Sequence, residues 1–396
     1  MVADSHVTVL RPLLIDSAFL CRWIQSPQVQ DEIENFASGT TNQIELNTST
    51  VINLLMPLPP LEEQRRIAAR IEQMMTRCDA IEKLRAARDS KRLSAHAAAM
   101  ECLLSSVEGE EHRTWHFLNR NFRELYSAKE NISELRQVAQ QLAVIGKLKS
   151  QESSDAPAFD LLKEIEVEKL RLAKKKSGAP LRSTVNTCPV APPFSLPEKW
   201  EWVRLGDIAI ASDSGWSPQC KPEPRVGGDW GVLKVSAVSW GRFDPSENKA
   251  LPGNLEPRKE CEVRPGDFLI SRANTDDLVA RSVIAVEAPK HLMMSDKIVR
   301  FSLSSHVNKQ FVNLVNGSRL SRSYYISNAS GTSSSMKNVS RQVMENLPVP
   351  LPPLAEQHRI VAKLERLNAL CDTLEMHIDA INLKRTELLN AVTARL

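Results

Sequence analysis

A long-period repeat constrains the fold of this chain more than any other feature of its sequence. Residues 347–360 read Leu-Pro-Val-Pro-Leu-Pro-Pro-Leu-Ala-Glu-Gln-His-Arg-Ile, and residues 54–67 read Leu-Leu-Met-Pro-Leu-Pro-Pro-Leu-Glu-Glu-Gln-Arg-Arg-Ile in the same register. In each copy an extended arm stops at two prolines, whose fixed φ suits the first turn of a helix. Glutamates then place negative charge near the positive end of the helix dipole. The sequence therefore predicts two helices, each started by one copy.

Apolar residues continue both helices as a seam. They recur at alternating steps of four and three, the pattern that buries one stripe of a helix against a partner. The predicted seam residues are Ile67, Ile71, Met74, Cys78 and Ile81 in the first copy and Ile360, Leu364, Leu367, Cys371, Leu374 and Ile378 in the second. A proline pair before such a helix is ordinary architecture when it occurs once. Because it occurs twice, the simplest prediction is that the two helices pack on each other.

The repeat extends upstream of the proline motif with a one-residue offset. Asp4 matches Asp296, Phe19 matches Phe311, and residues 37–40 match residues 329–332. Residues 4–55 thus repeat residues 296–348, whereas nothing in the chain corresponds to residues 197–292. We expect the N-terminal residues to be the last third of a domain whose fuller copy lies near the C-terminus.

Composition divides the chain into five predicted segments. Residues 1–56 form the end of a first globular domain, 57–177 a helical region, 178–197 a proline-rich linker, 198–350 a second globular domain and 351–396 a C-terminal helix. The second domain contains short β-branched or alternating runs separated by turn residues, with a helix expected near residues 306–322. The predicted class is α+β, with a mixed α/β domain joined to long helices.

The sequence lacks the signatures of catalysis and of cofactor binding. A phosphate-binding loop would need a glycine upstream of Gly146 and Lys147, and no Gly-x-Gly turn follows a predicted strand to hold an adenosyl cofactor. The eight histidines do not cluster with carboxylates at the spacing of metal ligands. We therefore predict no catalytic residue and no metal site in this chain.

Cysteine usage and hydropathy indicate the compartment. The seven cysteines are scattered with no Cys-x-x-Cys pair, which is typical of a reducing environment. The first residues have neither the basic nor the apolar part of a signal peptide, and no run approaches the roughly 20 apolar residues of a membrane span. The predicted location is the cytoplasm, with no membrane partner. Because the net charge is only +3, any surface for a polyanion must be a local patch.

Binding chemistry is concentrated at two places in the second domain. Residues 271–274, Ser-Arg-Ala-Asn, follow an apolar strand, and residues 330–338 form a polar loop that contains a glycine. Arginine can fork onto guanine, asparagine can bridge adenine, and serine, threonine and lysine can hold phosphates. The candidate DNA-binding residues are Lys234, Arg272, Asn274, Lys297, Ser330, Thr332, Ser334, Lys337 and Asn338. The alternative is an ordinary polar loop without a ligand.

Several motifs together resemble the specificity subunit of Type I restriction-modification systems. They are the duplicated Pro-Leu-Pro-Pro-Leu-x-Glu-Gln-x-Arg-Ile motif, residues 135–147 and 196–207, and the blocks at 266–275, 295–297 and 330–332. The resemblance covers essentially the whole chain. It implies a non-catalytic subunit with two target-recognition domains in a pseudo-twofold arrangement. An antiparallel pair of helices would join them and set the gap between two half-sites of double-stranded DNA.

The same resemblance implies partners and exposes two departures. Methyltransferase subunits would bring S-adenosylmethionine, and a restriction subunit would bring ATP and Mg, so this chain would hold no cofactor. Only residues 4–55 of the first recognition domain are present, and Ala280 stands where glycine is expected. Either the chain is a fragment of a longer reading frame, or it is a half-specificity protein completed by a second copy. The alternative function is a scaffold that binds methyltransferase subunits through its helices without reading DNA. An autonomous methyltransferase is disfavoured by the missing cofactor loop.

Overall fold

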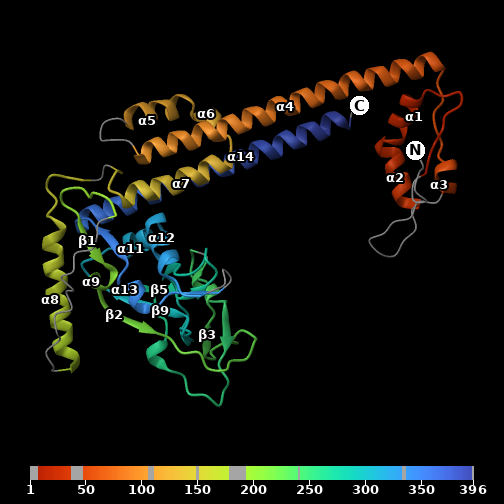
Figure 1. Ribbon diagram of the computed structural model, residues 1–396. Helices are drawn as coiled ribbons and strands as arrows, with labels where there is room; N and C mark the ends of the chain where they lie inside the picture. The colour runs from red at the N-terminus through yellow and green to blue at the C-terminus, as the bar shows by residue number, and fades with distance from the viewer. Residues whose placement is uncertain are drawn as a thin grey trace. The chain divides into compact units, whose positions relative to one another are not determined.

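The computed structural model describes residues 8–36, 48–105, 111–148, 151–177, 193–239, 241–331 and 336–394 (Figure 1). The chain divides into two compact units, Met1–Ser94 and Ala95–Leu396. The long helix α4 (Leu61–Ser105) passes through the boundary between them. Each unit is therefore described by itself.

The first unit is helical in its described residues. It contains α1 (Ser17–Ile24), α2 (Pro27–Phe36), α3 (Thr48–Ile52) and the start of α4. The Asp16 side chain caps α1 by accepting from the N–H of Phe19 at 3.0 Å. Gln64, which is 2% exposed, accepts from the Asp16 N–H at 2.9 Å and donates to the Pro59 carbonyl at 2.8 Å. This glutamine thus ties the first turn of α4 both to the proline arm and to α1.

The second unit repeats this arrangement in detail. It contains α11 (Lys309–Gly317), α12 (Arg319–Asn328), α13 (Arg341–Glu345) and α14 (Leu354–Thr393). Asn308 caps α11 by accepting from the Phe311 N–H at 3.0 Å. Gln357 accepts from the Asn308 N–H at 2.9 Å and donates to the Pro352 carbonyl at 2.8 Å. The internal repeat predicted from the sequence is confirmed down to these hydrogen bonds.

The second unit also carries the sheets of the fold. A four-stranded antiparallel sheet has the order β2 (Ala209–Ser214), β9 (Ile298–Leu303), β5 (Asp267–Ser271), β7 (Ser282–Ala285). A second sheet has the order β4 (Asn248–Ala250), β3 (Gly231–Leu233), β8 (Leu292–Met293). Short helix α9 (Leu205–Ile208) precedes β2, α10 (Ser236–Ser239) lies between β3 and β4, and the 3-10 turn η1 (Lys259–Cys261) lies between β4 and β5. The predicted α+β class is confirmed, and the helix expected near 306–322 is split into α11 and α12.

One strand pair joins the sheet domain to the start of α14. β1 (Glu201–Arg204) runs antiparallel to β11 (Pro348–Leu351), the arm of the proline motif. The Trp200 indole N–H donates to a carboxylate oxygen of Glu356 at 2.9 Å, and both residues are buried. The Trp200 ring meets the edge of Phe311 in the main apolar core. The arm and the first turn of α14 are therefore part of the core of this domain.

A helical layer accompanies α14 within the second unit. It consists of the end of α4, α5 (Glu111–Arg120), α6 (Phe122–Leu125) and α7 (Lys129–Val144). The next helix, α8 (Ala158–Ser177), instead lies against the sheet domain, where Lys169 donates to the Gly206 carbonyl at 2.9 Å. All of these helices fall within residues 57–177, for which the sequence predicts a helical region. α7 runs antiparallel to α14, since Lys129 pairs with Asp379 at 2.6 Å and Arg136 pairs with Asp372 at 2.7 Å.

The predicted seam residues differ in burial. On α14, Ile360 and Leu364 lie in the core of the sheet domain, and Cys371 lies in a helical core that includes Met100, Ile132 and Leu142. The sequence did not identify α7 as a partner of α14. The remaining seam residues of α14, which are Leu367, Leu374 and Ile378, are half-buried, as are Ile67 and Ile71 of α4, whereas Met74, Cys78 and Ile81 are exposed. Mutual packing of the two repeated helices stays a prediction.

A buried carboxylate beside the first turns of α14 makes the stability of the second unit pH-dependent. Burial alone would raise the pKa of Asp155, but hydrogen bonds from Arg359 and from the Glu152 N–H hold that pKa below its usual value. Because the pKa of this carboxyl is lower in the folded state than in the unfolded state, its ionised form stabilises the fold at pH values above the unfolded-state pKa of about 3.9. That stabilisation is lost as the pH falls through the folded-state pKa. Replacing Asp155 by asparagine should lower the free energy of unfolding by about 1.5–3 kcal/mol at pH 7. Urea titrations at pH 7 and pH 3 measure this difference, which should shrink at the lower pH.

Asp160 supplies the matched control for this experiment. Its side chain is 55% exposed and pairs with Lys163 of the same helix at 2.9 Å. Exposed helix pairs contribute about 0.3–0.5 kcal/mol, so Asp160→Asn should change stability little. Equal losses in the two variants would show that Asp155 has no special role.

Candidate nucleic-acid interface

Two short strands bring most of the predicted DNA-binding residues together. β6 (Ala273–Asn274) and β10 (Lys337–Asn338) pair antiparallel, with Lys337 opposite Asn274. Ser330 forms a bridge to Asn338, in which each N–H donates to the other's carbonyl at 2.8 Å. We call residues 272–274, 330–331 and 336–338 the polar ribbon. It contains five of the predicted residues, of which Asn274, Lys337 and Asn338 lie on the two paired strands.

A buried strand holds the polar ribbon in place. β5 is buried along most of its length and leads directly into Arg272. The N–H of Arg272 donates to the Lys297 carbonyl, and its carbonyl accepts from the Val339 N–H, both at 2.8 Å. Arg272 is thus fixed from both sides by its backbone, while Lys297 is brought beside the ribbon by its own carbonyl.

Several buried polar atoms at and beside the polar ribbon have no partner. Arg272 Nε and Asn338 Oδ1 lie on the ribbon, and Ser295 Oγ lies two residues before Lys297. Each is buried and makes no hydrogen bond within the described structure. Leaving such a group unsatisfied costs about 1–3 kcal/mol, so each of these atoms is prepared for a polar ligand.

Each of the predicted lysines lies near a carboxylate, and Lys337 Nζ also donates to the Gly331 carbonyl at 3.2 Å. Lys234 lies 3.6 Å from Glu247, Lys297 lies 3.6 Å from Asp296, and Lys337 lies 3.8 Å from Asp276. The lysine side chains are between 22% and 50% exposed. Exposed pairs of this kind contribute about 0–1 kcal/mol, so these ammonium groups can exchange a carboxylate for a phosphate at little cost.

The other predicted residues are less available for DNA binding or lie elsewhere. Both ends of the Asn274 amide are engaged in the fold, since Nδ2 donates to Ser239 Oγ and Oδ1 accepts from the Thr275 N–H, each at 2.9 Å. Asn274 therefore shapes the ribbon and has less capacity left for a base. Lys234 follows β3 and is not part of the ribbon. Thr332 and Ser334 lie outside the described residues.

Comparison with known proteins identifies the family to which this arrangement belongs. Residues 1–88 and 197–383 match the family model described as the Type I restriction modification DNA specificity domain. The specificity subunit of the Type I restriction enzyme EcoEI from Escherichia coli is 32% identical over 404 residues, covering 99% of this chain and 67% of the relative. The chain belongs to the Type I restriction-modification DNA specificity family.

Further comparisons agree with that placement. The EcoAI specificity subunit of Escherichia coli is 27% identical, again over 99% of this chain and 67% of the relative. A solved structure from work on complex assembly and conformational transition of the type I R-M system shares the fold at a TM-score of 0.50, with 18% identity over 96% of this chain and 70% of that one. The chain thus spans about two thirds of the length of its curated relatives. In this family the specificity subunit is the DNA-recognition component and is not catalytic.

The position where this family pattern predicts glycine has the backbone that glycine favours. Ala280 adopts a φ of 55°, in the left-handed region, and is fully buried. Its carbonyl accepts from Arg322 and from Asn316, each at 2.8 Å. Burial and, to a smaller extent, the nearby Arg281 lower the pKa of Arg322 to about 10. Arg322 and Asn316 were not predicted from the sequence, because their role is visible only once the loop after β6 is folded over them.

Gly331 sets the turn of the polar ribbon in this specificity subunit. Its φ is 125°, and a Cβ atom there would lie 2.3 Å from the Met336 carbonyl oxygen. Strain of this kind costs about 1–3 kcal/mol, so Gly331→Ala should displace β10 and weaken DNA binding by roughly 5- to 150-fold. Fluorescence anisotropy with a labelled duplex measures the loss. Gly253→Ala is the control, since a Cβ atom at Gly253 meets nothing within 4 Å and binding should be unchanged.

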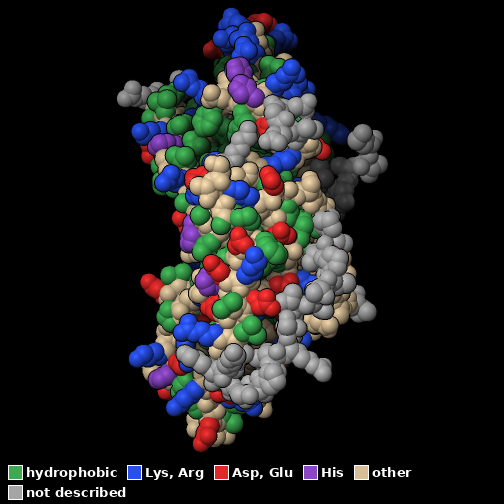
Figure 2. All heavy atoms as spheres, turned by 90° about the vertical axis from the view of Figure 1, so that its left-hand side faces the viewer, with side chains coloured by type: hydrophobic (Ala, Val, Ile, Leu, Met, Phe, Trp, Pro, Cys, Tyr) green, Lys and Arg blue, Asp and Glu red, His purple; other side chains and the backbone are tan. Residues whose placement is uncertain are grey.

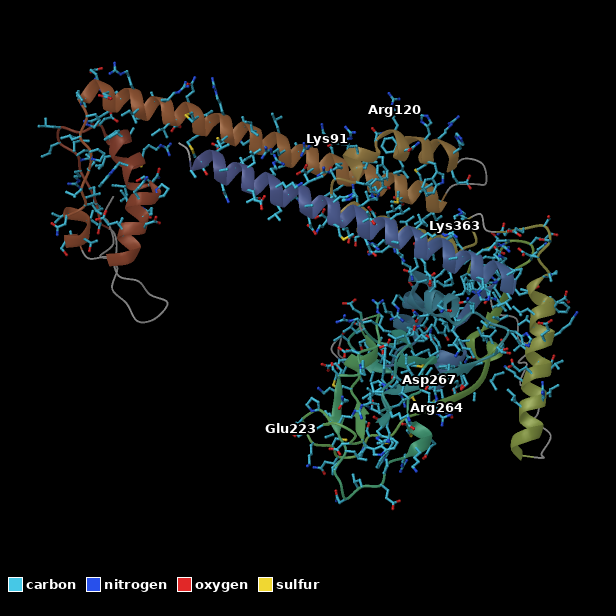
Figure 3. The ribbon with its side chains drawn as sticks, turned by 180° about the vertical axis from the view of Figure 1, so that it is seen from behind. Lys91, Arg120, Glu223, Arg264, Asp267 and Lys363 are labelled. Atoms are coloured by element: carbon cyan, nitrogen blue, oxygen red, sulfur yellow. The ribbon has the colours of Figure 1, made fainter. Side chains whose placement is uncertain are left out.

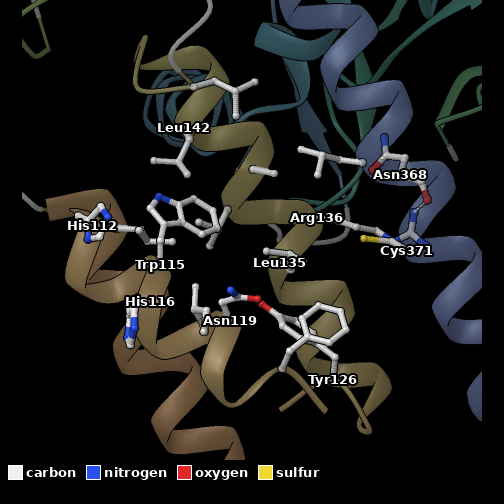
Figure 4. A pocket seen from close by; sticks show the side chains of 17 residues that line it. His112, Trp115, His116, Asn119, Tyr126, Leu135, Arg136, Leu142, Asn368 and Cys371 are labelled. Carbon is white, nitrogen blue, oxygen red and sulfur yellow. Dashed lines mark hydrogen bonds between the residues drawn. The ribbon is translucent and has the colours of Figure 1, made fainter. Parts of the chain in front are cut away.

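The second unit also presents an apolar groove between α5, α7 and α14 (Figure 4). Its volume is about 560 Å³, and its lining includes Trp115, Phe122, Leu135 and Leu367. Trp115 is 48% exposed and Phe122 is 44% exposed. Figure 2 shows hydrophobic side chains beside histidines in the upper part of one face of the molecule. His112 and His116 line the groove. An apolar surface of this kind is suited to a protein partner.

The described residues show no metal cluster and no membrane-spanning helix. Within the described ranges no group of three or more His, Cys, Asp and Glu side chains could hold a metal ion. No helix in the same ranges is long and apolar enough to cross a membrane.

Proposed function

We propose that this specificity subunit reads one half of a bipartite target in double-stranded DNA with the polar ribbon, in the cytoplasm. The observation that carries the proposal is the presence of two orphaned atoms on the ribbon, the donor Arg272 Nε and the acceptor Asn338 Oδ1. The edges of base pairs offer both acceptors and donors, so they can satisfy both kinds of atom.

The two-stranded form of the polar ribbon suits the major groove of DNA. That groove is about 12 Å wide and admits a two-stranded β-ribbon. An asparagine bridges adenine by accepting from N6 and donating to N7, and Asn338 Oδ1 is the acceptor that lacks a partner. Arg272 would fork onto a guanine, and Lys297 and Lys337 would move from their carboxylates to phosphates.

The subunit would act within a larger assembly. Methyltransferase subunits that use S-adenosylmethionine would bind the helices, and an ATP-driven restriction subunit with its Mg would join through them. The second half-site would be read by a completed first recognition domain, either of a longer chain or of a second copy. The length of the paired helices would then set the distance between the half-sites.

Electrophoretic mobility shift with the purified methyltransferase partner tests this function. The wild-type complex should bind one duplex sequence in the presence of excess bulk DNA, with lower affinity at higher salt because phosphate contacts release counterions. Equal affinity for all sequences would contradict half-site reading.

The groove between α5, α7 and α14 favours a second candidate function. A scaffold that binds methyltransferase subunits without reading DNA needs only a partner surface, and the exposed Trp115 and Phe122 supply one. Co-purification with the methyltransferase together with methylation lacking any sequence preference would support the scaffold. Trp115→Asp should abolish co-purification under either function, since both depend on the partner.

A further inference from the structure

The proline arm of the second unit shows what covers this element when it is complete. β11 pairs along its whole length with β1, and the Leu205 N–H donates to the Leu347 carbonyl at 3.0 Å. Val349 and Leu351 are fully buried as a result. Trp200, just before β1, adds its indole hydrogen bond to Glu356. The segment at residues 196–208 is therefore the cover of this arm.

The first unit contains the same arm without that cover. Residues 54–58 correspond to 347–351, and Leu55 and Leu58 are 90% and 64% exposed. Glu63, which corresponds to the buried Glu356, is exposed. No strand occurs among the described residues of the first unit. Its arm thus exposes an apolar extended segment and a carboxylate acceptor, whose counterparts in the second unit are covered by a strand and an indole.

The uncovered arm is nevertheless held in place. Gln64 fixes the Pro59 carbonyl and the Asp16 N–H with the same two hydrogen bonds that Gln357 makes in the second unit. Phe19, the counterpart of the ring that Trp200 meets, is packed in place at 7% exposure. Pro57 has no N–H, which suits an edge that accepts one strand and no more. The arm therefore does not need to be ordered by whatever binds it.

We propose that residues 54–58, together with Glu63 and Phe19, form a docking site for an antiparallel β-strand preceded by a tryptophan, with the chemistry of residues 196–208. The strand would add to the arm by backbone hydrogen bonds, and the tryptophan would place its indole N–H on Glu63. The occupant is thus a polypeptide segment that resembles the opening of the second recognition domain. The inference depends on the internal repeat and not on DNA reading.

A labelled peptide tests the docking site on the full chain. The probe is a fluorescein-labelled peptide of residues 196–208, followed by anisotropy, and hydrogen exchange locates its binding. We expect saturable binding with protection of residues 54–58. A peptide with alanine in place of the first tryptophan, and the chain variant Leu58→Asp, should each bind at least tenfold more weakly. Leu389→Asp, at a side chain that is 59% exposed on α14, should bind like the wild type.

Three results would overturn the proposal. One is absence of binding to the wild-type chain. Another is protection of residues 348–351, which would show that the peptide exchanges with β1 in the second unit. The third combines two observations: the wild-type chain is a dimer that becomes a monomer in Leu58→Asp, and the peptide does not bind. The arm would then be covered by a different surface of a second copy of the chain.

Discussion

Replacing Trp200 by alanine should lower the free energy of unfolding of the second unit by about 3–5 kcal/mol. Trp200 is 4% exposed and fills the core between β1, α11 and the first turn of α14. Its removal leaves a cavity and takes a hydrogen bond from the buried Glu356. Urea denaturation followed by circular dichroism measures the change, with the midpoint falling and the slope retained.

Two further variants separate packing from hydrogen bonding at this site. Trp200→Phe keeps an aromatic ring but loses the indole N–H, so it should cost about 1–3 kcal/mol. Trp202→Ala is the positional control, because Trp202 is half-buried and its indole donates to the Phe194 carbonyl at 3.2 Å. A loss in Trp202→Ala equal to that in Trp200→Ala would contradict the special place of Trp200 in the core.

Removing the side chain of Arg272 should cost about 1–3 kcal/mol of discrimination between the preferred DNA sequence and one with the contacted base pair changed. The folded protein should keep its stability, because Arg272 Nε makes no hydrogen bond in the described structure. Lys337→Ala should instead weaken binding to all sequences. It should also reduce the slope of log affinity against log salt concentration by about one, the contribution of one phosphate contact. Anisotropy titrations of both duplexes at several salt concentrations measure these effects.

Arg264 provides the matched control for Arg272. It is exposed and precedes β5, whereas Arg272 follows the same strand. Five strand residues place about 16 Å between the two ends. In Figure 3 Arg264 lies beside Asp267, whose carboxylate accepts from the Arg264 N–H at 2.9 Å. Arg264→Ala should leave both affinity and discrimination unchanged, and an equal effect of the two arginines would point to general charge rather than base reading.

The sequence predicts the repeated elements of this fold well, for a physical reason. The proline pairs, the matching positions of Gln64 and Gln357 and the capping residues Asp16 and Asn308 act locally, so the two copies form the same turns. The helix that packs against α14 could not be predicted in this way. Heptad spacing shows that a helix has an apolar stripe but not which helix covers it, and α7 was therefore not foreseen.

The candidate site was predictable only in part. Arg272, Ser330, Lys337 and Asn338 were found as residue types near strands, and their convergence on β6 and β10 follows from pairing that the sequence does not encode locally. The engagement of Asn274 by Ser239, the support from Arg322 and the orphaned Ser295 Oγ depend on contacts between segments far apart in the chain. Their roles in DNA binding remain predictions.

Selection from a library of randomised duplexes, with the wild-type and Asn338→Ala chains each bound to the methyltransferase partner, tests DNA reading by the polar ribbon most directly. We predict that both select the same sequence except at one base pair of the half-site, where the variant accepts any base. Identical selected sequences for the two chains would contradict the assignment of base recognition to the polar ribbon.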